Sequence, residues 1–191
     1  YYETGLETLE QAQQKKLDQI CRKLNLAPGD HLLEIGTGWG GLAVWAATRY
    51  GCRVTTTTIS EEQYRHAREW VARLGPEVAS RVTVLLTDYR QLTGKYDKIV
   101  SIEMFEAVGL NHYDDYFGAI ERLLAPNGSM LLQTITVDEQ HFPHYHGEPD
   151  WIEKYIFPGG ELASVGEILQ SLARVTSMSL YHAENLGTHY A

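Results

Sequence analysis

The chain has 191 residues, of which 43% are hydrophobic and 21% charged, and its formal net charge is −9. This length suffices for one domain with a proper core, and this composition is typical of soluble globular proteins and excludes intrinsic disorder. The acidic balance argues against proteins that bind nucleic acid through Lys and Arg clusters, and against an electrostatic anchor on anionic lipid.

The first predicted element is a helix that begins after Thr8. Apolar residues recur near the helical period over residues 9–24, and Thr8 with Gln11 has the spacing of a capping box. Strands and helices then alternate along the chain. The expected strands are residues 31–35, 52–59, 81–86, 96–102, 129–137 and 176–181, and the expected helices are 42–50, 61–74, 111–124 and 164–173, with turns at 75–80 and 125–128. This alternation predicts an α/β fold with a mainly parallel twisted sheet and helices on both faces.

The alternation stops after Val137. Residues 138–162 contain several prolines and no clean period, and segments of this kind are usually active-site loops, lids or binding segments. Three histidines, His141, His144 and His146, lie in it, but their spacing is not that of known zinc sites. We therefore predict a loop or lid over 138–162 and no metal site.

The strongest functional motif is LEIGTGWGG, at the end of the first predicted strand. Glycine is needed where the backbone turns tightly and where a ligand approaches main-chain N–H groups. A dinucleotide site would also need an acidic residue at the end of the second strand, which this chain lacks. An acid, Glu34, instead precedes Gly36 and Gly38, which suits a ligand with an ammonium group, as in S-adenosylmethionine. A glycine-rich turn without a ligand is the competing interpretation.

The ends of the second and third predicted strands supply further candidate cofactor contacts. Thr58, Ser60 and Gln63 can hold ribose hydroxyls, although the same stretch can be a strand end and helix cap. Asp88 can accept a hydrogen bond from an adenine amino group, and Tyr89 can stack on a base. Ordinary loop residues are the alternative for this second pair.

Two carboxylates and one amide mark the next strand ends. Glu103 and Glu106 lie just past the fourth predicted strand, where open α/β sheets bind ligands, and Gln133 interrupts the apolar run of the fifth. Buried carboxylates and amides are costly without partners, so these three side chains indicate a functional site. Acids at the start of a helix are the competing explanation.

The segments LEIGTGWGG, TTTTISEEQ, VLLTDYR, VSIEMFEAVG, MLLQTIT, KYIFPGG and GTHYA together resemble the cyclopropane-fatty-acyl-phospholipid synthase family, which includes the mycolic acid cyclopropane synthases. The resemblance implies a Rossmann-like class I S-adenosylmethionine-dependent methyltransferase fold, with residues 1–191 as a single catalytic core. It also implies that a cis double bond of an unsaturated phospholipid chain takes up the methyl group. Loss of a proton to a bound bicarbonate then closes a cyclopropane ring.

The resemblance also assigns the site residues. Glu106, Gln133, the backbone of Ile135 and Tyr190 correspond to the positions that hold bicarbonate. The cofactor-binding residues that we predict are Glu34, Gly36, Gly38, Thr58, Ile59, Ser60, Gln63, Asp88, Tyr89 and Ile102.

Two positions depart from the familiar family pattern. Gln133 stands where those members have His, and Glu103 stands where they have Gly. Glutamine can donate to bicarbonate but cannot share a proton, so the base is in question and a methylene or methyl branch becomes an alternative product. A small-molecule methyl acceptor and a non-catalytic cofactor-binding module are the further alternatives.

We expect a cytoplasmic protein, peripheral to the membrane, that contacts its phospholipid substrate transiently and does not bind nucleic acid. A homodimer is compatible with this interpretation. The chain has no apolar run long enough to span a bilayer, and its two cysteines, Cys21 and Cys52, are expected to be buried free thiols. Because family members extend beyond both ends, we expect a longer enzyme whose last strand is missing here.

Overall fold

The computed structural model describes residues 1–145, 155 and 160–190, and its centre is one parallel five-stranded sheet with the order β3-β2-β1-β4-β5. The strands are β1 His31–Ile35, β2 Arg53–Thr58, β3 Val82–Leu86, β4 Tyr96–Ile102 and β5 Leu124–Gln133. The α-helices are α1 Leu9–Lys23, α2 Gly41–Trp45, α3 Glu61–Arg73, α4 Pro76–Ala79, α5 Tyr113–Leu123, α6 Phe142–Tyr145 and α8 Val165–Val175. A π-helical turn, Ala46–Tyr50, continues α2, and short 3-10 turns cover Tyr89–Gln91, Phe105–Ala107, Leu110–His112 and Gly187–His189.

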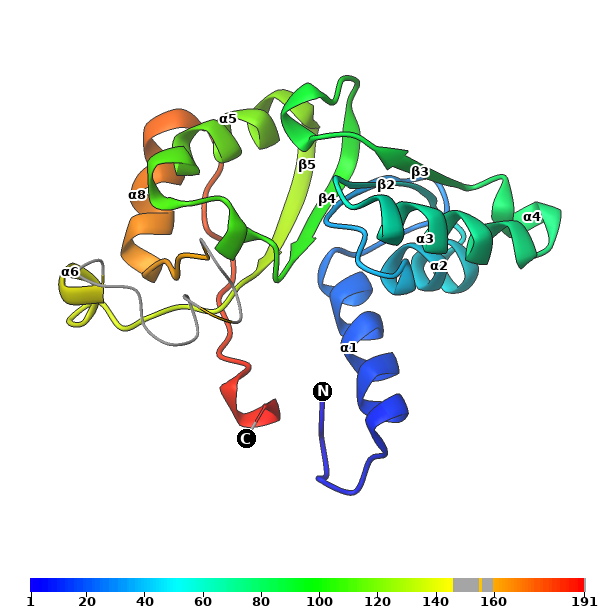
Figure 1. The fold of residues 1–191 in the computed structure, drawn as a ribbon, viewed down its shortest axis with the longest axis horizontal. Helices are drawn as coiled ribbons and strands as arrows, with labels where there is room; N and C mark the ends of the chain where they lie inside the picture. The colour runs from blue at the N-terminus through cyan, green and yellow to red at the C-terminus, as the bar shows by residue number, and fades with distance from the viewer. Residues whose placement is uncertain (146–154, 156–159, 191) are drawn as a thin grey trace.

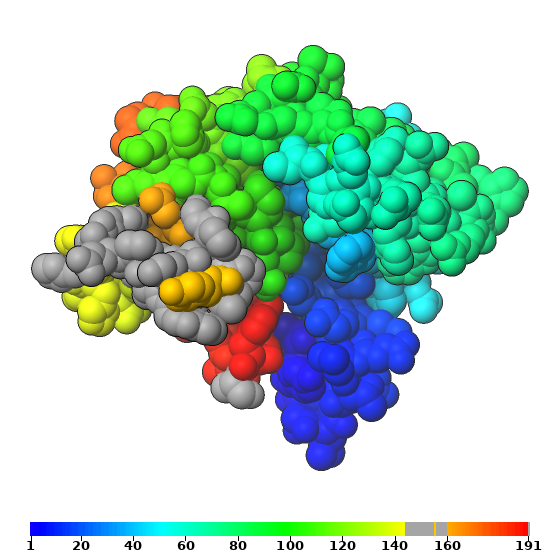
Figure 2. Space-filling model, in the orientation of Figure 1, coloured from blue at the N-terminus to red at the C-terminus, as the bar shows by residue number. Residues whose placement is uncertain are grey.

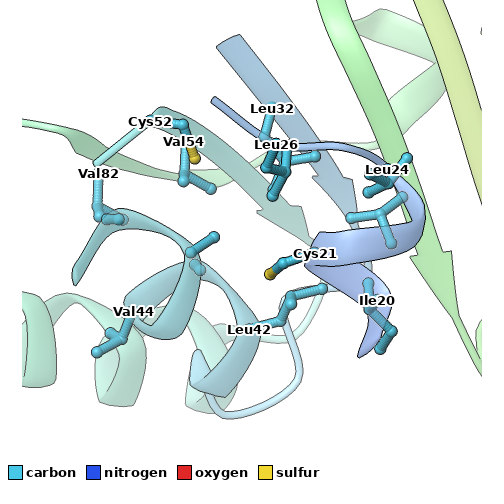
Figure 3. Packing of buried hydrophobic residues seen from close by; sticks show 14 of the residues in the cluster. Ile20, Cys21, Leu24, Leu26, Leu32, Leu42, Val44, Cys52, Val54 and Val82 are labelled. Carbon is cyan, nitrogen blue, oxygen red and sulfur yellow. The ribbon is translucent and has the colours of Figure 1, made fainter. Parts of the chain in front are cut away.

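Helices cover both faces of the sheet, as predicted. Figure 1 shows α5 and α8 on one side, and α1, α2 and α3 on the other. Successive strand residues point to opposite faces, so Leu32 packs in the cluster with α1 and α2 while Leu33 packs in the cluster with α5 and α8. In Figure 3 the thiol of Cys21 points from α1 into the first cluster, close to Leu42. Cys21 and Cys52 are buried and free, which confirms that expectation.

Local capping fixes where α1 begins. Thr8 Oγ1 accepts a hydrogen bond from the Gln11 N–H at 3.2 Å, and Gln11 Oε1 accepts from the Thr8 N–H at 2.9 Å. This reciprocal pair is the predicted capping box, and it satisfies backbone donors that the helix itself cannot.

The predicted strand over 176–181 is wrong. Thr176 ends α8, with its Oγ1 donating to the Leu172 carbonyl at 2.6 Å. The Ser177 N–H and Oγ both donate to the Glu121 carboxylate, at 3.3 and 2.7 Å, so this backbone is bound to α5 instead of to a strand. Leu180 and Tyr181 are exposed. Among the described residues, β5 is therefore an edge of the sheet.

Smaller differences concern turns and boundaries. The short helix α4 lies within the turn predicted at 75–80, and β5 includes the turn predicted at 125–128. The pairing of β4 with β5 shifts register between Tyr96 and Lys98, which accommodates the extra residues as an irregularity in β5. β5 ends at Gln133, four residues earlier than expected, and beyond it an isolated bridge pairs Thr136 with Ala163.

The packing of α5 makes a stability prediction. Ile120 is completely buried between α5 and the sheet, so Ile120→Ala should lower the free energy of unfolding by about 2–5 kcal/mol, measured by urea denaturation. Leu180→Ala is the matched control, because Leu180 is exposed in the segment that forms no strand. A comparable loss at Leu180 would contradict this description of the segment.

Candidate functional site

The glycine-rich loop after β1 needs its glycines for geometry. Gly36, Gly38 and Gly40 have φ of +98°, +51° and +94°, in the region that favours glycine. A Cβ on Gly36 would lie 3.1 Å from Met104 Cβ, and one on Gly40 would lie 3.2 Å from Ala67 Cβ. The loop therefore packs closely against the segment after β4 and against α3. Its bare backbone at the carboxyl end of β1 can admit a ligand.

Glu34 is a buried acid at the base of this loop. Its side chain is 4% exposed, and its Oε2 accepts a hydrogen bond from Thr56 Oγ1 at 2.6 Å. Burial raises the pKa of the Glu34 carboxyl to about 8, and the bond from Thr56 only partly opposes that effect. A cationic ligand group beside Glu34 would favour the ionised carboxylate. A site for an ammonium group needs such an acid, whose carboxylate can pair with the positive charge.

The end of β2 forms a helix cap. Thr58 Oγ1 donates to Gln63 Oε1 at 2.8 Å and accepts from the Ser60 N–H at 3.1 Å. Ser60 Oγ accepts from the Gln63 N–H at 3.3 Å, which makes Ser60 the N-cap of α3. The capping interpretation is thus correct for these three residues. Their predicted role in holding ribose stays a prediction, as does that of Ile59, which is 78% exposed beside them.

Asp88 and Tyr89 follow β3 and already have partners within the chain. The Asp88 carboxylate accepts from Arg90 Nη2 at 2.6 Å and from Arg90 Nε at 3.0 Å, and this pairing lowers the pKa of Asp88. The Tyr89 ring packs edge-on against the buried ring of Tyr116, with centroids 5.4 Å apart. An adenine would have to share Asp88 with Arg90, and their roles toward adenine remain predictions.

A carboxylate cluster lies where β4 and β5 end. Ile102 pairs with Gln133, and the next residue, Glu103, donates its N–H to the Gln133 carbonyl at 2.8 Å. Glu103 Oε1 accepts from Gln133 Nε2 at 2.7 Å and from the Tyr190 hydroxyl at 2.6 Å. Lys16 Nζ, on α1, lies 3.5 Å from the same oxygen. Four segments far apart in the sequence thus meet at one oxygen atom.

Glu106 lies one turn beyond Glu103 and faces the segment after β5. Its Oε1 accepts from the Ile135 N–H at 2.7 Å. Its Oε2 is buried and has no hydrogen-bond partner among the described residues. The nearby Tyr113 hydroxyl is also buried and unpaired within the described residues, and burial, with the charges of Glu161 and Glu106, raises its pKa. Two buried polar atoms without a partner among the described residues mark this region as a candidate functional site.

The two ends of the described chain complete this region. The Tyr2 N–H donates to His189 Nδ1 at 3.2 Å, and the Tyr1 and His189 rings lie 3.8 Å apart. Figure 2 shows the C-terminal segment, in red, against the blue N-terminal region. A pocket of about 400 Å³ opens there, lined by Tyr1, Tyr2, Leu9, Ala12, Gln13, Lys16, Glu103, His189 and Tyr190.

Part of the predicted set therefore lies in two groups near the carboxyl ends of the strands. Glu34 and the glycine loop form the first group, and Glu106, Gln133, Ile135 and Tyr190 lie in the second. Sequence reasoning missed Lys16, because one lysine in an amphipathic helix carries no signal. It pointed to Glu103 as a carboxylate past the fourth predicted strand and as a departure from the family pattern, but did not include it among the assigned site residues.

Part of the predicted loop over 138–162 lies outside the described residues. This applies to residues 146–154 and 156–159, which include His146, and the side chain of His144 is likewise not described. Within the described residues, no three His, Cys, Asp or Glu side chains are grouped so that they could hold a metal ion.

Comparison with known proteins gives consistent matches. The model of the family described as mycolic acid cyclopropane synthetase matches residues 1–191. Cyclopropane-fatty-acyl-phospholipid synthase of Escherichia coli is 44% identical over 189 residues, which are 99% of this chain and 46% of that protein. Tuberculostearic acid methyltransferase UfaA1 of Mycobacterium tuberculosis is 41% identical over 180 residues, which are 94% of this chain and 42% of that protein. The chain thus spans less than half the length of these two relatives.

Solved structures agree with the predicted fold. The cyclopropane synthase MmaA2 from Mycobacterium tuberculosis matches with a TM-score of 0.88 at 32% identity, over 98% of this chain and 68% of that one. Mycolic acid cyclopropane synthase CmaA1, complexed with SAH and CTAB, matches with a TM-score of 0.89 at 34% identity, over 100% of this chain and 69% of that one. The Rossmann-like fold of class I methyltransferases is confirmed.

The buried Glu34 predicts a pH-dependent stability. Its pKa of about 8 in the folded protein exceeds the ordinary 4.5, so the folded state binds this proton more tightly than the unfolded state. The stabilisation is complete below about pH 4.5 and is lost as the pH rises through about 8. Glutamine has no such proton to lose. The stability of Glu34→Gln relative to wild type should therefore increase by up to about 1.4 kcal/mol per pH unit across this window.

Urea denaturation at several pH values measures this difference. Glu69→Gln is the control, because Glu69 is exposed on α3 and, among the described residues, pairs only with Arg73, at 3.5 Å. Its difference from wild type should stay nearly constant with pH. A constant difference for Glu34→Gln as well would contradict a buried, protonated Glu34.

Proposed function

The chain belongs to the mycolic acid cyclopropane synthetase family, and from that membership we propose that residues 1–191 are the catalytic core of an S-adenosylmethionine-dependent C-methyltransferase. Its substrate is an unsaturated phospholipid, and its product carries a methylene across a cis double bond of the acyl chain. One observation supports this proposal most directly. Glu34, at the site proposed for an ammonium-bearing ligand, lies at the carboxyl end of its strand. The carboxylate cluster of Glu103 and Glu106 lies at the carboxyl end of the neighbouring strand β4.

The residues after β1 suit S-adenosylmethionine. The glycine loop offers backbone without a Cβ, and Glu34 can neutralise the ammonium group of the methionine part. Thr58, Ile59, Ser60, Gln63, Asp88, Tyr89 and Ile102 are proposed to surround its ribose and adenine. When bound, this cofactor supplies an electrophilic methyl group.

The protein itself has two tasks toward the alkene. An alkene is a weak nucleophile, so the site must hold the reacting carbon in line with the methyl group and keep water away. Attack on the methyl group leaves positive charge on the acyl chain. The carboxylates of Glu103 and Glu106 are proposed to stabilise that charge, because anionic groups held by hydrogen bonds are fixed before the cation develops.

The bicarbonate that the family resemblance implies does not fit the donors of this cluster. Gln133 Nε2 and the Tyr190 hydroxyl both donate to Glu103, and the Ile135 N–H donates to Glu106. Each donor assigned to bicarbonate thus already faces a carboxylate of the protein. An added anion would have to displace these carboxylates or be repelled by them. We derive no step through bicarbonate.

A methyl-branched chain is the second candidate product. Gln133 stands where the family resemblance expects histidine, and one relative is named a tuberculostearic acid methyltransferase. If the proton leaves from a neighbouring carbon instead of the methyl group, the product carries a branch and no ring. Both products come from the same site and cofactor.

We propose a cytoplasmic enzyme that contacts the membrane transiently to reach its substrate. None of the helices described is both long enough and apolar enough to cross a bilayer. Large apolar side chains are exposed at Leu6, Leu9 and Trp39, and their surface supports contact with lipid that does not depend on charge.

The first test is incubation of the natural full-length protein with S-adenosylmethionine and vesicles of unsaturated phospholipid. Mass spectrometry of the acyl chains should show a gain of one methylene, and NMR should distinguish a ring from a branch. Saturated phospholipid is the control and should not react. Methylation of a soluble metabolite without any change in lipid would contradict the proposed substrate.

Glu106→Gln separates binding from turnover. The amide oxygen of glutamine can still accept from the Ile135 N–H, so the local structure should persist. Binding of S-adenosylhomocysteine, measured by calorimetry, should remain nearly unchanged, while turnover falls by about 100-fold because the negative charge is lost. Equal losses in both would show that Glu106 is only structural.

A further inference from the structure

Glu103 adopts a backbone conformation that is unusual for its residue type. Its φ is +50°, in the left-handed region that glycine favours. The bond from its N–H to the Gln133 carbonyl, at 2.8 Å, holds it there at the end of β4. Strained non-glycine residues of this kind concentrate at functional sites. A glycine would fit this backbone without strain, so the glutamate side chain calls for a physical reason.

The hydrogen bonds of Glu103 are unevenly divided between its two oxygens. Oε1 accepts from Gln133 Nε2 and Tyr190 and lies near Lys16, while within the described residues no donor contacts Oε2. The side chain is 41% exposed and lines the 400 Å³ pocket between the two chain ends. One oxygen therefore fixes the carboxylate, and the other is available to a molecule in the pocket.

We propose that the Glu103 carboxylate is the base of this enzyme and occupies the position that bicarbonate takes in the familiar family members. This inference rests on the proposed function. Carboxylate and bicarbonate share one negative charge and a planar pair of oxygens. The Gln133 amide and the Tyr190 hydroxyl, which the family resemblance assigns to bicarbonate, bind Glu103 instead. A side chain attached to the backbone also needs no binding equilibrium before each turnover.

The proposed step moves one proton from the transferred methyl group to Glu103. The alkene electron pair forms a bond to the methyl carbon, and the carbon–sulfur bond breaks with its electrons remaining on sulfur. A cation is left on the other alkene carbon. A C–H bond of the transferred methyl group then supplies its electrons to close the ring, and its proton moves to Glu103 Oε2. The protonated carboxyl later releases that proton to water.

The neighbours of Glu103 hold its carboxylate in place. Lys16 supplies the adjacent positive charge, at 3.5 Å. Burial, together with the bond to Glu103, raises the pKa of Tyr190, so its hydroxyl stays protonated and continues to donate. Gln133 fits this role better than a titratable group would, because its amide donates at every pH. Glu103 and Gln133 thus suit each other, since one supplies the acceptor and the other a permanent donor.

Three variants of the full-length protein test the proposal. Glu103→Gln removes the charge and keeps the side-chain volume. Glu103→Gly removes the side chain, relieves the positive φ and leaves the donors of Gln133 and Tyr190 open to an anion. Glu69→Gln is the control on the exposed face of α3. Two readouts are compared: binding of ¹³C-labelled bicarbonate to the protein loaded with S-adenosylhomocysteine, followed by NMR, and turnover in buffer depleted of carbon dioxide.

Wild type should bind no bicarbonate at this site, and its turnover should not change when bicarbonate is added. Glu103→Gln should lose about 100-fold in kcat with little change in the KM for S-adenosylmethionine, and bicarbonate should not restore it. Glu103→Gly should bind bicarbonate and regain turnover when it is added. Glu69→Gln should behave as wild type.

Other results would overturn the proposal. These are bicarbonate binding at this site in wild type, wild-type turnover that depends on bicarbonate, or wild-type kcat in Glu103→Gln. Absence of any one-carbon gain in lipid in every protein would instead reject the phospholipid substrate. The contrast in bicarbonate binding between wild type and Glu103→Gly would still decide whether Glu103 fills the bicarbonate position.

Discussion

The hydrogen bond from the Glu103 N–H to the Gln133 carbonyl fixes the geometry on which the candidate site depends. It extends the pairing of β4 with β5 by one residue past Ile102 and turns Glu103 into the left-handed conformation. All strands of the sheet are parallel, so this bond and the glycine loop after β1 both lie at the carboxyl ends of the strands. The buried carboxyl of Glu34 and the hydrogen-bonded carboxylate of Glu103 thus both lie at the carboxyl ends of the strands, because of the strand direction and the turns after β1 and β4.

The site concentrates negative charge in a protein that is already acidic overall. Glu34, Glu103 and Glu106 lie near the carboxyl ends of the strands, and the surroundings of each carboxyl group differ. Burial raises the pKa of Glu34. Glu103 is surrounded by Lys16 and two neutral donors, and Glu106 is bound by a backbone N–H. An anionic edge of this kind suits a positively charged cofactor and a cationic intermediate on the acyl chain. It is poorly suited to holding a further anion such as bicarbonate.

Much of this arrangement could be predicted from the sequence because its causes are local. The Thr8 and Gln11 cap and the glycine loop each depend on a few neighbouring residues. The strand expected over 176–181 does not form, and there Ser177 is bound by Glu121, more than fifty residues away. Lys16 and Glu103 came together only through the fold, since they are 87 positions apart. Contacts between distant segments leave no signal in a single sequence.

A crystal structure of the full-length protein with S-adenosylhomocysteine, grown from a solution that contains bicarbonate, tests the central claim most directly. We predict that Gln133 Nε2 and the Tyr190 hydroxyl will both contact the carboxylate of Glu103, with the cofactor seated between the glycine loop and Glu34. Density for a separate bicarbonate ion on those two donors, with the Glu103 side chain turned away, would contradict the account.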